Sequence, residues 1–245
     1  MSGRLKGKVE KIRERNREAA LEMPFNYCDR WCARCGVTAR CLVYQEEMNE
    51  KLNQMADGKD PDSFESVMES VKKGTQKSIA LIRTWAKEEG IDLTADPFDE
   101  EEIKLASLRS RKCLQHSLSR LAHAFCKEAY SFLKRNYYRK SADYSEVHRD
   151  EYQVLEWFHT LLPVKIRRLL ESLYGEEKVG SDPLVQEALL ADAVAQMDIC
   201  GKAISLCQKA CDALTAPHPV ELVPLAKMRT FLDRMEEELK NFERS

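Results

Sequence analysis

Glycine and proline are scarce in this chain, with nine and eight occurrences among 245 residues. Together with a hydrophobic share of 43%, this scarcity excludes a disordered chain and leaves enough apolar surface for a core. Long hydrophobic runs are missing too, since no stretch approaches the roughly 18 to 20 apolar residues that span a bilayer. The sequence therefore predicts a folded protein with no membrane contact.

The motifs of several enzyme classes are also missing. The sequence contains no nucleophile elbow, phosphate-binding glycine loop, zinc-protease helix or dinucleotide-binding fingerprint. These absences do not exclude an enzyme, but its chemistry would need a metal centre or polar residues in a helical core. The sequence leaves open whether the protein is an enzyme.

The chain has no large excess of either charge, because 39 basic and 41 acidic residues leave a formal net charge of −2. Seven basic residues lie between positions 4 and 17, but glutamates alternate with them. A solvated helix is the simplest interpretation of this segment, and nucleic-acid binding is disfavoured. An acidic protein partner is the alternative ligand for this basic helix.

Cysteine is not scarce, and its use indicates the compartment. Five of the nine cysteines lie outside the dense group described below, an odd number that fits reduced thiols better than a disulfide framework. The basic N-terminus is followed by neither the apolar core nor the cleavage site of a signal peptide. We therefore expect a cytoplasmic protein.

The strongest chemical signal is this dense group of cysteines. It comprises Cys28, Cys32, Cys35 and Cys41 within fourteen residues. The first three are separated by four and three residues, which places their thiols on one face of a helical turn. Pro24 and Asn26 are typical of the start of a short helix, and Gly36 is typical of its end. We expect one short helix there, with Thr38 as a second cap before the fourth cysteine.

Four thiolate ligands suit either tetrahedral Zn²⁺ or an iron–sulfur cluster. Structural zinc sites usually combine two separated Cys-x2-Cys pairs, whereas compact cysteine runs are common around [4Fe-4S] clusters. Only Cys32 and Cys35 form such a pair here, so an iron–sulfur cluster is favoured over zinc. Cysteines without a metal, either reduced or disulfide-bonded, are the third alternative.

The spacing from Cys28 to Cys35 also resembles the Cys-x3-Cys-x2-Cys motif of radical S-adenosylmethionine enzymes, which leave one iron open for the cofactor. Two features argue against this assignment. Cys41 supplies a fourth ligand that closes the site, and the chain lacks the alternating strands and helices that a barrel requires.

Periodic apolar residues predict helices along most of the chain. The expected helices cover residues 41–56, 62–89 with a break near Gly74, about forty residues from Asp99, 145–174, 183–214 and the C-terminal residues after Pro219. The last four are long and joined by short connections, which predicts an all-α fold built on an antiparallel bundle of four helices. Residues 1–60, with the basic helix and the cysteine segment, are expected to pack on the bundle of residues 61–245 in one continuous domain.

Four polar residues lie near the centres of otherwise apolar helix faces. They are Arg111, Glu151, Lys165 and Asp192. Counting back from the connection at 175–182 puts Lys165 level with Asp192, so these two are the expected buried ion pair. Such a pair fixes the register of two helices, although desolvation offsets much of its attraction. A polar pocket for a small anionic ligand is the alternative interpretation.

Two further patterns indicate metal ligands less strongly. Glu156 and His159 have the Glu-x2-His spacing of ferritin-like di-iron proteins, but the second copy of the motif is missing. One face of a later helix carries Cys200, Cys207 and Cys211, with His148 across the bundle. Buried small side chains explain these cysteines more simply, because cysteine packs as a compact hydrophobe.

The stretches Phe25–Cys41 and Gln153–Leu169 each carry a recognisable pattern. The first contains Cys-x3-Cys-x2-Cys-x5-Cys, and the second is a helix with tryptophan and lysine. Both resemble a family of uncharacterised bacterial all-helical proteins, in which Pro-Phe-Thr often follows the third cysteine where this chain has Gly36-Val37-Thr38. The resemblance implies a helical fold with a cysteine motif and brings no activity with it.

These observations predict a metal-binding helical protein in which an iron–sulfur cluster on the four cysteines serves a redox, sensing or structural role. The alternative is an interaction module without catalytic activity, in which zinc holds the cysteine segment and the basic N-terminal helix docks a protein partner. Exposed apolar helix stripes also leave a homodimer open.

Overall fold

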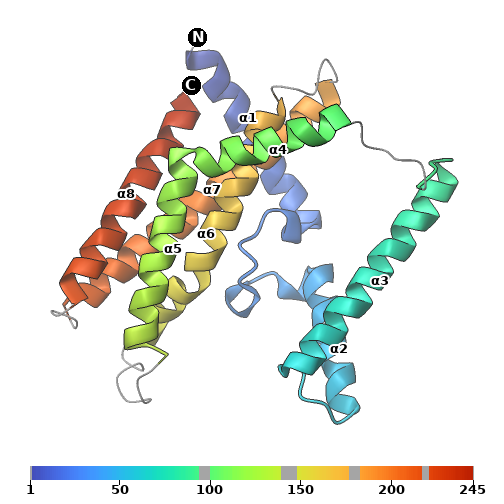
Figure 1. Cartoon of the computed structure of the whole chain (residues 1–245), viewed down its shortest axis with the longest axis horizontal. Helices are drawn as coiled ribbons and strands as arrows, with labels where there is room; N and C mark the ends of the chain where they lie inside the picture. Colours follow the sequence, from blue (N-terminus) through green and yellow to red (C-terminus); the bar gives the residue numbers. More distant parts are fainter. Residues whose placement is uncertain (1, 94–99, 139–147, 177–182, 217–220, 245) are drawn as a thin grey trace. The chain divides into compact units, whose positions relative to one another are not determined.

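The computed structural model describes residues 2–93, 100–138, 148–176, 183–216 and 221–244. These residues contain eight α-helices and no strand, which confirms the all-α class (Figure 1). The helices are α1 (Ser2–Glu22), α2 (Leu42–Ala56), α3 (Phe64–Glu88), α4 (Glu100–Gln115), α5 (Ser117–Asn136), α6 (Arg149–Glu176), α7 (Pro183–Thr215) and α8 (Leu222–Arg244). None of the helices in the described ranges is both long enough and apolar enough to cross a membrane.

Contacts between residues divide the chain into two units. The first unit consists of Met1–Trp31 with Ser107–Ser245, and the second consists of Cys32–Ala106. The expected boundary near residue 60 lies inside the second unit, because the N-terminal segment up to Trp31 packs with the later helices. The observed division between the two units lies inside the cysteine segment, between Trp31 and Cys32.

Four long helices of the first unit surround one apolar core. Helix α5 packs against α6 and α8, and α7 packs against the same two helices (Figure 1). The largest fully buried side chains include Tyr152, Phe125, Phe132, Phe158, Leu118 and Leu133. Burial of apolar surface on this scale is the main favourable contribution to folding, at roughly 25 cal/mol per Å².

Polar contacts beside this core fix the direction of α8 against α5. In order along α5 they are Ser117 with Glu238 at 2.6 Å, Glu128 with Lys227 at 2.7 Å and Arg135 with Glu221 at 2.8 Å. As the residue numbers rise along α5, those of the partners fall along α8. The two helices therefore run in opposite directions.

The basic helix α1 packs against α7 and α8. Nε of Arg13 donates to Asp198 at 2.9 Å, and Arg15 pairs with Glu187. The side-chain amide of Asn16 donates to the carbonyl of Ala191 at 3.0 Å. Part of the positive charge of α1 is therefore engaged within the first unit.

The expectation of one long helix from Asp99 is wrong, because two helices, α4 and α5, meet at His116 (Figure 1). His116 has an extended backbone, with φ −62° and ψ 141°, and its Nδ1 accepts a hydrogen bond from the N–H of Leu118 at 3.1 Å. The imidazole thus caps α5 by satisfying one of the N–H groups left over at a helix start. No glycine or proline marks the break, and histidine is not a usual cap.

Local sequence signals were correct in part for the other helices. The expected break of α3 at Gly74 is wrong, and Ser63 caps this helix by accepting from the N–H of Ser66 at 3.2 Å. Gly90 follows α3 with a φ of 67°, as expected for a glycine at a helix end. Pro163 lies inside α6 without ending it.

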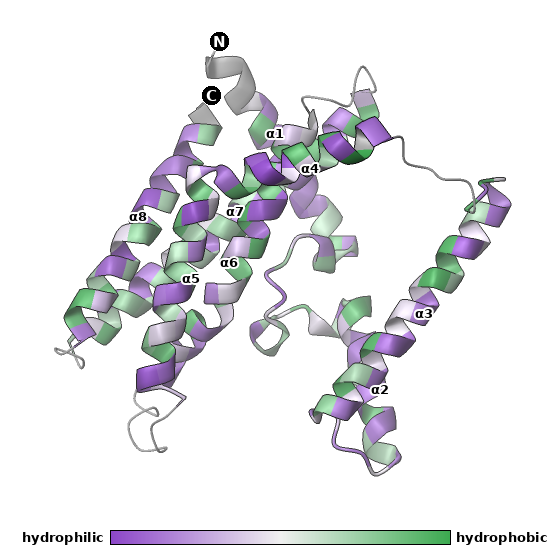
Figure 2. Cartoon of the chain, viewed as in Figure 1, coloured by the Kyte–Doolittle hydropathy of each residue, from purple (hydrophilic) through white to green (hydrophobic). Residues whose placement is uncertain are grey.

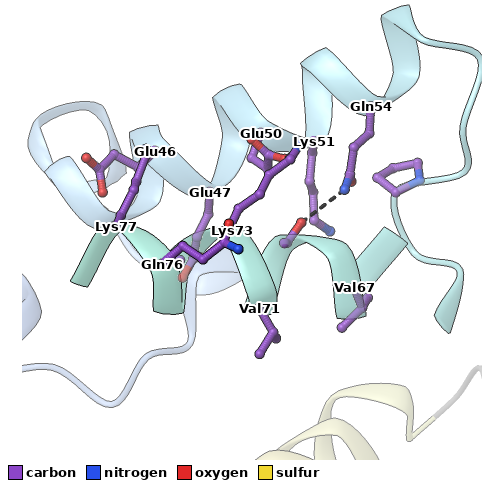
Figure 3. Close-up of a pocket in the computed structure, with 13 residues that line it drawn as sticks. Glu46, Glu47, Glu50, Lys51, Gln54, Val67, Val71, Lys73, Gln76 and Lys77 are labelled. Carbon is purple, nitrogen blue, oxygen red and sulfur yellow. Dashed lines mark hydrogen bonds and ion pairs between the residues drawn. The ribbon is translucent and has the colours of Figure 1, made fainter. Parts of the chain in front are cut away.

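In the second unit, α2 and α3 contact each other through polar side chains (Figure 3). The amide of Gln54 donates to the carbonyl of Ser66 and to the hydroxyl of Ser70, both at 3.0 Å, and Lys73 pairs with Glu50 at 2.9 Å. A groove of about 580 Å³ lies between the helices, and both charged side chains such as Glu47 and Lys73 and apolar ones such as Val67 and Val71 line it. The hydrogen bonds and the ion pair that join the two helices are hydrophilic contacts.

The cap at His116 predicts a pH-dependent stability. Burial lowers the pKa of His116, while the charge of Glu238 opposes this effect. Only the neutral ring accepts from Leu118, so the cap contributes fully above the unfolded-state pKa of about 6.5. This contribution is lost as the pH falls through that value toward the lower pKa of the folded state.

We expect the free energy of unfolding to decrease on acidification, and His116→Asn to reduce this dependence because asparagine caps without titrating. Chemical denaturation at neutral and mildly acidic pH measures the effect. His123→Asn, at an exposed histidine of the same helix, is the matched control and should keep the wild-type dependence. The same slope in His116→Asn as in the wild type would contradict the prediction.

Candidate functional site

The cysteine segment folds as three one-turn 3-10 helices. They are η1 (Pro24–Asn26), η2 (Cys32–Arg34) and η3 (Thr38–Arg40). The expected single helix is wrong, because Arg30 adopts a positive φ of 59° that no right-handed helix contains. Cys28 is therefore separated from the turn that holds Cys32.

Backbone hydrogen bonds close two of these turns beside cysteines. The N–H of Cys35 donates to the carbonyl of Cys32 at 3.1 Å, and the N–H of Cys41 donates to the carbonyl of Thr38 at 3.1 Å. The expected capping role of Thr38 is wrong, since the N-cap of η3 is Val37 and no side chain caps this turn. Cys41 occupies the N-cap position of α2 and is buried, whereas the other three cysteines are partly exposed.

All nine cysteines lie among the described residues, and no disulfide joins any two of them. Within the described part of the chain, no three Cys, His, Asp or Glu side chains are arranged to hold a metal ion. The structure thus gives each of the four cysteines a defined backbone environment without gathering their thiols into a ligand set.

The start of the cysteine segment is anchored to α6 and α7. Nζ of Lys165 donates to the carbonyl of Cys28 at 3.3 Å, and Nε1 of Trp157 donates to the carbonyl of Asp29 at 3.0 Å. The Asp29 carboxylate accepts from Lys202 at 2.7 Å. It also accepts from the N–H of Trp31 at 3.1 Å. Asp29 therefore stabilises the local turn and also joins it to Lys202 of α7.

Trp31 completes the anchor by packing on α6. Its ring stacks on Trp157 with centroids 5.8 Å apart and planes 13° from parallel. It also meets Phe158 edge to face, with centroids 5.5 Å apart. Trp31 thus attaches the start of the cysteine segment to the core of the first unit.

Lys165 and Asp192 do not form the expected ion pair. Lys165 is directed to Cys28, while Asp192 accepts from Arg168 at 2.6 and 3.1 Å and from Ser172 at 2.7 Å. Arg168 lies about one turn beyond Lys165, so Asp192 meets α6 one turn away from the predicted position. Burial lowers the pKa of Lys165, and the nearby charge of Arg168 lowers it further.

The other two predicted core residues lie elsewhere. Arg111 is exposed on α4, and Glu151 contacts His148 at 3.7 Å near the start of α6. The structure therefore does not gather the four predicted polar residues into one pocket.

The remaining candidate ligands are engaged within the fold. Nδ1 of His159 lies 3.1 Å from the carbonyl of Leu155 and 2.8 Å from that of Glu156, so its ring is turned back onto α6. The three late cysteines on α7 are buried, and burial raises the pKa of Cys200 and of Cys211 to about 12. Thiols in such surroundings fit the interpretation as compact core residues.

Comparison with known proteins gives no relative, because no family model, curated protein or solved structure matches this chain. The functional interpretation therefore depends on the residues themselves. Sequence reasoning missed the anchoring roles of Asp29, Trp157 and Lys202, whose contacts join positions more than 120 residues apart.

The contacts at Asp29 predict that the Trp157 donor contributes more to the free energy of unfolding than the Lys202 donor. Trp157→Phe keeps an aromatic ring, though a smaller one, for stacking and leaves the Asp29 carbonyl without this donor, which should cost about 1 to 3 kcal/mol in the free energy of unfolding. Lys202 is 63% exposed, so Lys202→Ala should cost less than about 1 kcal/mol.

Chemical denaturation measures both costs, and hydrogen exchange of residues 28–31 should quicken more in Trp157→Phe. Lys202→Ala serves as the matched control, because it removes a contact to the same residue from the solvent side. Equal costs for the two variants would show that the indole N–H does not hold the segment.

Proposed function

We propose that Cys28, Cys32, Cys35 and Cys41 bind one metal centre. We further propose an iron–sulfur cluster rather than zinc, in a redox, sensing or structural role. The observation that carries the proposal is the anchored start of a four-cysteine segment whose thiols form no disulfide. Soft thiolates suit both metals, and the compact spacing favours the cluster.

The anchor supports the proposal because it acts on the backbone next to the first ligand. Lys165 and Trp157 hold the carbonyls of Cys28 and Asp29, so the chain direction at Cys28 is fixed while its thiol is partly exposed. Contacts that orient ligands from outside the coordination sphere are a regular part of metal sites. Because the backbone at Cys28 is already ordered, less conformational entropy is lost when the segment closes around a metal.

The local charge also supports a negatively charged centre. The ammonium group of Lys165 lies at the start of the segment, where it donates to the carbonyl of Cys28, while that of Lys202 is paired with the Asp29 carboxylate. Cys41 lies at the first turn of α2, where unsatisfied N–H groups and the helix dipole favour a nearby negative charge. Four thiolates around a metal carry net negative charge, which these groups offset.

The short turns leave the remaining ligands local freedom. η2 and η3 are single turns of three residues, so a rearrangement that brings their cysteines together would break no long helix there. When bound, a cluster would supply one-electron redox chemistry, while the residues of this chain hold it and limit its contact with water.

We also propose an antiparallel four-helix bundle of α5, α6, α7 and α8 as the rigid support of this segment. The opposite directions of α5 and α8 and the packing of each helix on two others are the supporting contacts. A cytoplasmic location fits nine cysteines without a disulfide, because thiols persist in reducing compartments.

Metal analysis after anaerobic purification tests the proposal. We expect about four irons and four sulfides per chain with visible absorbance, and loss of both in Cys32→Ser with Cys35→Ser. Cys126→Ser, at a partly exposed cysteine on α5, is the matched control and should keep the cluster.

Each outcome has a distinct meaning. One zinc per colourless chain, lost in the same double variant, would replace the cluster with a zinc-held segment and direct attention to protein partners. Helical chains without iron or zinc, under anaerobic conditions, would overturn the metal centre itself. Circular dichroism of each variant separates loss of metal from loss of fold.

A further inference from the structure

The second unit exposes large apolar side chains on α3. Phe64 is 74% exposed, and Val71 and Trp85 are each 55% exposed. Figure 3 shows Val67 and Val71, which also line the groove, pointing away from α2, and Figure 2 shows hydrophobic residues alternating with hydrophilic ones along α3. Because α2 and α3 meet through polar groups, this helix pair buries little of its own apolar surface. An apolar face of this length is typical of a protein–protein contact.

The outward residues of α3 have the spacing of a helix-pairing seam. They are Phe64, Val67, Val71, Thr75, Ser78, Ile82 and Trp85, each three or four positions from the next, and all are exposed. This spacing keeps the side chains on one side of the helix over its whole length. A second helix can therefore pack along the entire stripe.

The sizes of these side chains are similar when the stripe is read in either direction. An aromatic ring lies at each end, aliphatic side chains come next, and Gly74, Thr75 and Ser78 make the middle small. Among the described residues, no atom outside the helix lies within 4 Å of the place where Gly74 would carry a Cβ. Two antiparallel copies of this stripe would cross at their small middles, where the backbones can approach closely.

The charges of α3 favour the same orientation. Glu65 lies in the first turn, whereas Arg83 and Lys87 lie near the end, where Glu88 is the exception. Glu69 is already paired with Lys59 and Lys73 of the same chain. A parallel pair would place like charges side by side, but an antiparallel pair places each acidic end beside a basic end. The helix dipoles add to this preference, since opposite ends meet.

From these features we propose that α3 is a self-association surface, on which α3 of a second copy packs antiparallel with its crossing point near Gly74. In this arrangement Phe64 packs near the partner's Trp85, and Glu65 lies near the partner's Arg83. The contact uses α3 alone, so it requires no metal at the cysteine segment and goes beyond the proposed function.

Sedimentation equilibrium of the full chain at several concentrations tests the proposal. We expect a reversible monomer–dimer equilibrium that Ile82→Glu weakens at least about tenfold, because the new charge would be buried in the seam. Leu52→Glu is the matched control, since Leu52 of α2 is 54% exposed and Ile82 is 52% exposed. This control should leave the dimer intact, and circular dichroism verifies that both variants fold.

Charge reversal tests the orientation of the two helices. Glu65→Arg alone should weaken the dimer, because it puts two positive ends together. Adding Arg83→Glu to the same chain should restore association, since opposite charges again meet. A parallel pair would respond to neither change in this way, because each position would face its own copy.

Several results would overturn the proposal. A monomer at every concentration shows that no second copy covers this face. A dimer that Ile82→Glu leaves unchanged, or that Leu52→Glu weakens equally, places the contact elsewhere. Monomers that bind anionic lipid vesicles through α3 would make this helix a membrane-surface element instead.

Discussion

The packing of Trp31 against Trp157 and Phe158 is the contact on which the position of residues 28–31, the start of the cysteine segment, depends. Large aromatic side chains bury roughly 150 to 250 Å² each and dominate the energetics of such contacts. The surrounding polar contacts are individually weaker, and in the ion pair with Asp29 the Lys202 side chain is largely exposed. The ring contacts of Trp31 therefore hold the start of the segment. The hydrogen bonds of Lys165, Trp157 and Asp29 set the direction in which the backbone leaves the core.

Much of the helical structure could be predicted from local signals. The helix α7 occupies Pro183–Thr215, against an expectation of residues 183–214, because a proline suits a first turn and apolar residues recur at helical spacing. The same reasoning located α2 and α8 closely. Breaks were less predictable: His116 caps α5 without a usual capping side chain, and Arg30 takes a positive φ that glycine more often adopts.

The candidate site was less predictable than the helices, for a physical reason. Lys165 could be recognised as a polar residue on an apolar face, but its contact is the carbonyl of Cys28, which no periodic pattern of α6 encodes. The prediction that Lys165 pairs with Asp192 came from counting residues back from the connection at 175–182. That count assumes that only two helices meet at Lys165, whereas the cysteine segment also packs there. Spacing identified the four cysteines, whereas the approach of their thiols depends on a ligand and on torsions that local sequence does not fix.

The first unit is assembled from both ends of the chain, with Cys32–Ala106 inserted between them. A ribosome therefore releases α1 and Trp31 well before it has made α6 and α7, the helices that receive them. Loop-closure entropy rises only slowly with loop length, so the insertion costs the finished protein little. The nascent chain, however, must carry Trp31 without its ring partners until Trp157 and Phe158 of α6 have been translated.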